Sequence, residues 1–163
     1  MAPGRVDNST IPAMSTRLPP PLVLLIAAAL VWLIDRSLPA LRVSIPGLDV
    51  AAGVLAVVGV SLMGVAALGF AARHTTIDPV HPERASHLIV GGAYACSRNP
   101  IYLGDALLLV AWTLWLGNPA GLIMAPVFVA FITRFQIRPE ERALATRFGE
   151  RYRAYCRDVR RWF

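Results

Sequence analysis

The chain has 163 residues, of which 56% are hydrophobic and only 16% are charged, whereas soluble domains carry about 25% charged residues. The apolar residues stand in long blocks, which excludes an ordinary soluble domain, and the length allows a single domain. The formal net charge is +6, but the arginines that supply it flank the apolar blocks, which indicates anionic lipid head groups as partners and not nucleic acid.

The N-terminal tail, residues 1–18, is polar and rich in Ser, Thr and Pro, and we predict that it is disordered. The first helix is predicted from Pro21 to Leu38. Its apolar part, Leu22 to Ile34, also resembles the h-region of a signal peptide. Because further apolar blocks follow, we expect it to be retained as a membrane anchor, with Asp35 and Arg36 reaching the interface by snorkelling.

The second helix is the clearest, because residues 50–72 carry no charge and a run of that length spans a hydrocarbon core of about 30 Å. A long polar connection follows, residues 73–100. The third helix is predicted over residues 101–116 and the fourth over residues 120–135. Both are short, so we expect a tilted hairpin in which Pro126 kinks the fourth helix.

The last segment, residues 138–163, is basic and is predicted to form one amphipathic helix that lies on the membrane or caps the bundle. Its apolar stripe has helical spacing and consists of Leu144, Phe148, Tyr152 and Tyr155. The predicted fold is therefore all-α: residues 19–163 form one polytopic membrane domain with about four transmembrane helices and a C-terminal cytoplasmic amphipathic helix.

The arginines orient this arrangement. Of the 16 basic residues, only Arg36 and Arg42 fall on the side opposite to the two termini. Three tryptophans, Trp32, Trp112 and Trp115, fall near that opposite interface, as an aromatic belt would. We therefore predict an integral protein of a bacterial inner membrane with both termini in the cytoplasm.

Reactive side chains gather on the same predicted cytoplasmic side, which holds every histidine, tyrosine, cysteine and glutamate. A path through the bilayer would need polar residues near the midplane, but only Asp105 lies even one turn inside the third helix. This distribution favours an enzyme at the membrane face over a pump or channel.

Several sequence motifs follow one another in the same order as in a known protein family. Residues 74–79 read HTTIDP, residues 88–94 read LIVGGAY and residues 97–104 read SRNPIYLG. After the hairpin come Glu140-Glu141 and an aromatic-rich helix that ends at Arg161-Trp162. Over about residues 70–163 the chain resembles the isoprenylcysteine carboxyl methyltransferase and phospholipid methyltransferase superfamily. Asn99 stands where the isoprenylcysteine enzymes have histidine.

The resemblance implies S-adenosylmethionine as methyl donor, bound between the 73–104 connection and the start of the tail helix. Arg98 would hold the donor's carboxylate with two hydrogen bonds, and the two glutamates would pair with its ammonium or favour its sulfonium. The tyrosines would pack on the adenine or the sulfonium. The residues assigned to the donor are Gly91, Gly92, Tyr94, Arg98, Asn99, Pro100, Tyr102, Gly104, Glu140 and Glu141.

Methyl transfer from a sulfonium depends mainly on alignment, which supplies up to about 7–11 kcal/mol. The catalytic residues that the resemblance implies are Arg98, Glu141 and His74. A carboxylate acceptor is already ionised at neutral pH, whereas a thiol or an amine needs a base, for which His74 is the candidate. The acceptor is a membrane lipid or another lipophilic molecule, and whether it presents a carboxylate, a thiol or an amine stays open. Its binding is assigned to Tyr152, Tyr155, Arg161 and Trp162.

Other hypotheses remain beside this one. A membrane reductase of the sterol-reductase type would use NADPH, and a non-catalytic adaptor would bind anionic lipid through its basic tail. Glu140 and Glu141 also suit the positive end of a helix that starts at Pro139. The three histidines lack a metal-ligand spacing, so no metal is predicted, and no strand–glycine–helix pattern indicates a Rossmann fold.

Overall fold

The computed structural model of the chain describes residues 18–71 and 88–163, and every regular element among them is helical. The predicted tail and His74 lie outside these residues. The helices are α1 (Pro20–Ser37), α2 (Leu48–Ala71), α3 (Pro100–Leu116), α4 (Met124–Ile132), α5 (Arg138–Phe148) and α6 (Glu150–Asp158). Shorter turns are η1 (Pro39–Leu41), η3 (Gly92–Ala95) and η4 (Pro119–Ile123), which are 3-10, and η5 (Thr133–Ile137), which is a π-turn.

Three helical runs among the described residues are long and apolar enough to cross a membrane: Pro20–Ser37, Leu48–Gly69 and Pro119–Phe148. The apolar helix α3 is shorter. A lipid environment explains their composition, because a helix satisfies its own backbone hydrogen bonds where no water is available. The prediction of a polytopic, all-α membrane protein is confirmed.

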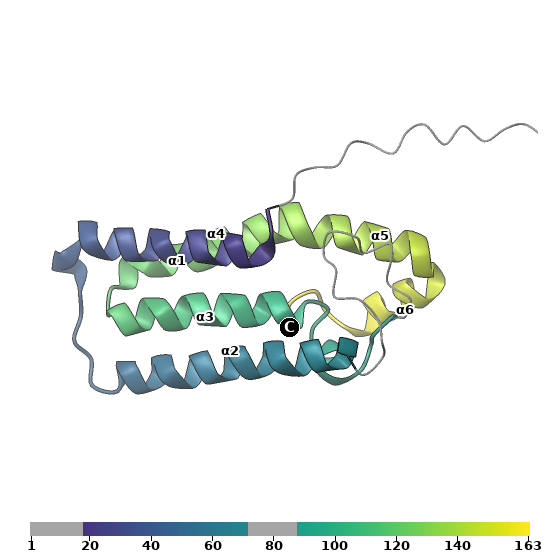
Figure 1. Cartoon of the computed structure of the whole chain (residues 1–163), viewed down its shortest axis with the longest axis horizontal. Coiled ribbons are helices and arrows are strands. Elements are labelled where there is room, and N and C mark those ends of the chain that lie inside the picture. Colours follow the sequence, from purple (N-terminus) through teal and green to yellow (C-terminus); the bar gives the residue numbers. More distant parts are fainter. Residues whose placement is uncertain (1–17, 72–87) are drawn as a thin grey trace, which may run out of the picture.

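Helix α3 lies in the middle of the bundle, with α2 along one side and α1 and α4 along the other (Figure 1). Val31, Leu109 and Phe128 make the core between α1, α3 and α4, and each is at most 2% exposed. Helix α2 approaches α3 closely at two glycines: a Cβ on Gly104 would lie 2.7 Å from the carbonyl oxygen of Gly59. Gly104, which the resemblance assigned to the donor, therefore serves helix packing.

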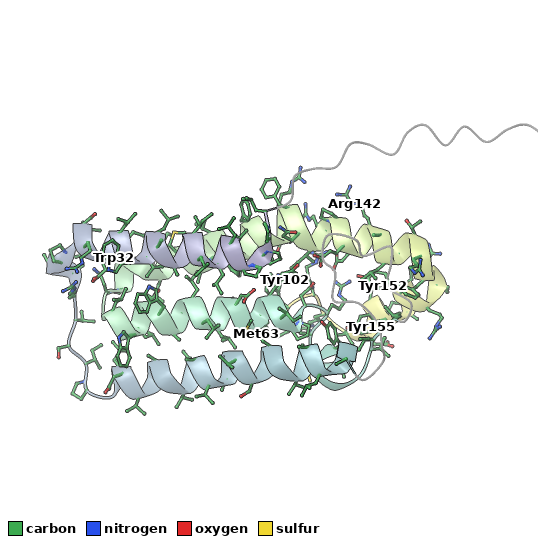
Figure 2. All side chains as sticks on the ribbon, viewed as in Figure 1. Trp32, Met63, Tyr102, Arg142, Tyr152 and Tyr155 are labelled. Carbon is green, nitrogen blue, oxygen red and sulfur yellow. The ribbon has the colours of Figure 1, made fainter. Side chains whose placement is uncertain are left out.

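An ion pair closes the end of the bundle that carries Trp32 (Figure 2). Asp35 is 2% exposed, and it accepts from Nε and Nη2 of Arg42 at 2.7 and 2.5 Å. Asn118 donates to the same carboxylate and to the Leu38 carbonyl, at 3.4 and 3.0 Å. Asp35, which was predicted to lie at the interface, joins α1 to the turn between α3 and α4.

The fourth helix does not end where it was predicted to end. The run Pro119–Phe148 is continuous, and the backbone passes through η5 into α5 without leaving helical dihedrals. Pro139 has no N–H to donate, and the π-turn just before it changes the hydrogen-bond register without breaking the helix. Glu140 and Glu141 stand in the first turn of α5 beside Pro139, as the sequence predicts, but the helical run continues before them, so this helix start is not a free N-terminus.

The predicted single tail helix is also divided. Gly149 has φ +54°, a conformation that other residues rarely adopt, and there the chain turns from α5 into α6. Helix α6 folds back toward the start of α3 (Figure 1). The apolar stripe becomes a cluster, in which Leu88, Tyr152 and Tyr155 pack with Leu144 and Phe148.

Candidate active site

The C-terminal residues hold the turn that precedes α3. The amide of Arg98 donates to the Arg160 carbonyl at 3.0 Å. The Arg161 carbonyl accepts from Nδ2 of Asn99 at 2.9 Å and from the Ser97 hydroxyl at 3.3 Å. Asn99, which was assigned to the donor, thus fixes this C-terminal strap (residues 159–163) against the turn.

Glu141 lies between two arginines that are far apart in the sequence, Arg98 and Arg161. Arg161 donates to its two oxygens from Nε and Nη2 at 3.0 and 2.7 Å. Nη1 of Arg98 lies 3.3 Å from Oε1 of the same carboxylate. The structure therefore brings Arg98 and Glu141 together, as the sequence predicts, and adds Arg161. Both oxygens of Glu141 are engaged by protein cations.

Arg98 has further hydrogen-bonding capacity. Its Nη1 donates to Sγ of Cys156 at 2.7 Å. Its Nε is buried and finds no hydrogen-bond partner among the described residues. Buried polar groups are nearly always paired in folded proteins, so this nitrogen is an exception within a side chain whose residue lines a pocket.

The neighbouring acid, Glu140, has a different environment. It accepts the hydroxyl hydrogen of Tyr102 at 2.7 Å, and Tyr102 is 6% exposed in the first turn of α3. One turn deeper, Asp105 is 4% exposed. The two acids at 140 and 141 therefore serve two different contacts.

Three tyrosines outside the membrane-spanning runs are packed beside this cluster. The hydroxyl of Tyr155 donates to the Tyr94 carbonyl at 2.7 Å. Burial raises the pKa of Tyr94, Tyr152 and Tyr155 above the usual phenol value, and Glu141 adds to this effect at Tyr152. These phenols stay neutral at physiological pH, so they act as hydrogen-bonding and packing groups.

Alkaline titration tests this environment. Because the folded pKa values lie above the unfolded value of about 10, stability is fully present below that pH and falls as the pH rises further. At a pH of about 11 most phenols of an unfolded chain are ionised. Since these three tyrosines resist ionisation and the fourth, Tyr102, is itself buried and bonded to Glu140, we expect the folded protein to show at most roughly a quarter of that tyrosinate absorbance. A full signal with unchanged helical circular dichroism would contradict the burial.

A pocket of about 590 Å³ opens beside these groups, a size typical of small-molecule sites. Its charged lining consists of Arg98, Arg134, Arg138, Arg142, Arg161 and Glu141, and Ala145, Tyr152 and Cys156 complete the wall. Arg142 and Tyr152 lie at the end of the bundle opposite to Trp32 (Figure 2). The pocket has a large excess of positive charge.

A comparison with known families identifies the architecture. The family model for phospholipid methyltransferases matches residues 49–151, which is more than half of the chain. The chain belongs to the phospholipid methyltransferase family. The match runs from α2 into the start of α6, so it contains Arg98 and both glutamates, whereas the C-terminal strap with Arg161 lies beyond it.

The phospholipid methyltransferase family is a family of membrane methyltransferases, which agrees with the apolar helices of this integral membrane protein. A protein of Haemophilus influenzae, described as an uncharacterized protein, is 47% identical over 62 residues; these cover 38% of this chain and 98% of that protein. No solved structure matches the chain. The family therefore supplies the class of chemistry, and the geometry of the site supplies the details.

Of the remaining predicted site residues, some line the pocket and others lie away from it. Tyr152 and Arg161 line the pocket, whereas Tyr155 is buried against Tyr94, and Trp162 packs against the core of α1, α3 and α4. Gly91 and Gly92 are exposed, with open space where a side chain would be. Pro100 begins α3 in the first turn, where its missing N–H costs nothing.

Sequence reasoning missed several pocket residues. Arg134, Arg138 and Arg142 had counted only toward membrane orientation, although their spacing of four residues indicates one helix face. Cys156 belongs to no recognisable motif. Its contact with Arg98 depends on the turn at Gly149, and the spacing of residues in the sequence does not predict that turn. The signal for the arginines was present, and the signal for the cysteine was not.

Proposed function

We propose that this family member is an S-adenosylmethionine-dependent methyltransferase that works at the cytoplasmic face on a lipophilic acceptor. The observation that carries the proposal is the arginine-lined pocket, in which Nη1 of Arg98 lies 3.3 Å from Oε1 of Glu141. The concentration of arginine at this end of the bundle supports the cytoplasmic orientation, since positive residues favour that side.

The residues present suit such a donor. Arg98 contributes a guanidinium to the pocket lining, which suits a carboxylate, and Tyr152 offers an aromatic wall to a nucleobase. Glu140 adds a negative charge in the first turn of α5, where Tyr102 holds its carboxylate in place. When bound, the donor supplies an electrophilic methyl group that an acceptor atom takes in one in-line displacement.

Glu141 acts in this proposal as a positioning residue. Its carboxylate is held by Arg161 and Arg98 together, so it fixes the direction of both guanidiniums and joins the C-terminal strap to α5. Such pre-orientation matters because a small misplacement of the reacting atoms costs a large factor in rate. The chain's own contribution is thus alignment and charge.

Calorimetry on the purified protein in detergent tests the proposal. We expect S-adenosylmethionine and its demethylated product to bind with dissociation constants of about 1–100 μM, the range common for enzyme substrates. NADPH serves as the matched control, because it also carries an adenosine group. Heat with NADPH and none with either methyl-donor ligand would overturn the methyltransferase proposal and favour the reductase.

A further inference from the structure

Asp105 is a buried acid that lies outside the cluster around Glu141. It is on α3, three residues after Tyr102 and four before Leu109, so the three side chains share one face of the helix. Tyr102 and Leu109 both belong to the apolar core that α3 makes with α1 and α4. Asp105 is 4% exposed. An ionisable residue buried between the apolar helices of a membrane protein is costly, which makes it a candidate for function.

Tyr102 connects Asp105 with the pocket. Its hydroxyl donates to Oε1 of Glu140 at 2.7 Å, and Glu140 directly precedes the pocket residue Glu141 on α5. Figure 2 shows Tyr102 on the bundle side of Tyr152, which also lines the pocket. Asp105 follows one turn farther into the bundle along α3. Two carboxylates, those of Glu140 and Asp105, therefore lie on the bundle side of the pocket.

The charge of the pocket repels a cation unless nearby acids offset it. Five arginines line the pocket against a single acid, Glu141, and both oxygens of that acid are engaged by arginine. Two other described acids at this end, Glu150 and Asp158, are exposed on α6, and Glu150 is paired with two arginines of the same helix. Among the residues that the structure describes, Glu140 and Asp105 are thus the acids placed to offset the arginines.

The methyl donor and its demethylated product differ by one positive charge at the sulfur atom. S-adenosylmethionine carries a sulfonium there, whereas the product carries a neutral thioether. Charges act on each other more strongly where water is excluded, so the arginines alone would favour the product over the donor. A buried carboxylate on the side of the sulfur atom reverses this preference, because it attracts a charge that only the donor has.

We propose that Asp105, together with Glu140, sets the specificity of the site for the charged donor over the neutral product. Glu140 is the acid nearer to the arginines, and Asp105 is the acid nearer to the apolar core, where its charge is less screened. A site with this preference exchanges the spent product for new donor after each turnover. The inference rests on the proposed function, because it takes S-adenosylmethionine as the donor.

Calorimetry on the full chain in detergent, with donor and product as a pair of ligands, tests the role of Asp105. We expect the wild-type protein to bind S-adenosylmethionine at least as tightly as the product. Asp105→Asn keeps the shape and removes the charge, so it should weaken donor binding by about tenfold and product binding by less than about twofold. Asp105→Glu keeps the charge and should keep most of the wild-type preference.

A second cationic ligand separates charge from shape. Sinefungin resembles the donor but carries an amine in place of the methylated sulfur, so it is positively charged at the same place. Its affinity should fall in Asp105→Asn as that of S-adenosylmethionine does. The matched control is Asp158→Asn, which removes an exposed acid at the same end of the molecule and should keep the wild-type preference.

The ratio of the two affinities is insensitive to general damage, because donor and product use the same site. Asp105→Ser, which is also neutral, replaces Asp105→Asn if that variant does not fold. A wild-type protein that prefers the product by more than about threefold, or neutral variants that weaken both ligands equally or neither of them, would overturn the role of Asp105 and leave the proposed function standing. A wild-type protein that binds neither ligand would overturn both.

Discussion

Replacing Arg98 with alanine is expected to weaken S-adenosylmethionine binding by about 100-fold or more. Hydrogen bonds to charged groups contribute about 1.5–3 kcal/mol each, and a tenfold change in affinity corresponds to about 1.4 kcal/mol. Arg98 has one buried nitrogen that no residue in the described part of the chain pairs with, and another that contacts Glu141 and Cys156. Its removal therefore takes away a guanidinium of the pocket and the contact that this guanidinium makes with Glu141. Calorimetric titration measures the effect.

Two further variants sharpen this test. Arg98→Lys keeps the charge but has no planar pair of donors, so we expect it to recover only a small part of the affinity. Arg151→Ala removes an exposed arginine of α6 outside the pocket and should bind like the wild type. If Arg98→Ala and Arg151→Ala bound the donor equally well, the pocket around Arg98 would not be the donor site.

The first three apolar helices were predictable within one or two residues because their signal is local, whereas the end of the fourth was not. A membrane span is set by the length of an uncharged run, and the prediction of Pro21 to Leu38 compares with Pro20–Ser37 in the structure. The meeting of Arg98 and Glu141 was also predicted, since a hairpin between two segments returns the second to the level of the first. The family resemblance supplied the choice of these two residues.

The parts that were missed depend on contacts without a side-chain pattern. A glycine inside a helical stripe costs only about 1 kcal/mol, so the spacing around Gly149 fits both a continuous helix and a turn. The strap is held through the backbone carbonyls of Arg160 and Arg161, which every sequence has. Arg42 pairs with Asp35 across a turn, and one sequence does not reveal such a pairing.

Glu141→Ala is expected to reduce the free energy of unfolding by about 2–3 kcal/mol and to prevent donor binding. Removing one partner of a buried ion pair costs about 3–5 kcal/mol, and the value is smaller here because the side chain of Arg161 is 35% exposed to solvent. The variant leaves Arg98 and Arg161 facing each other without the carboxylate between them. Denaturant unfolding in detergent, followed by helical circular dichroism, measures the loss.

A double-mutant cycle separates this interaction from general damage. We expect Glu141→Ala and Arg161→Ala to be coupled by about 1–2 kcal/mol, as contacting charged residues are, and additive effects would contradict a direct role for the strap.

Glu141→Asp then distinguishes an enzyme from an adaptor. The shorter side chain keeps the charge, so lipid binding by a basic surface is unaffected. It cannot hold both guanidiniums in the same directions, so a site that depends on alignment should lose about tenfold or more in methyl transfer.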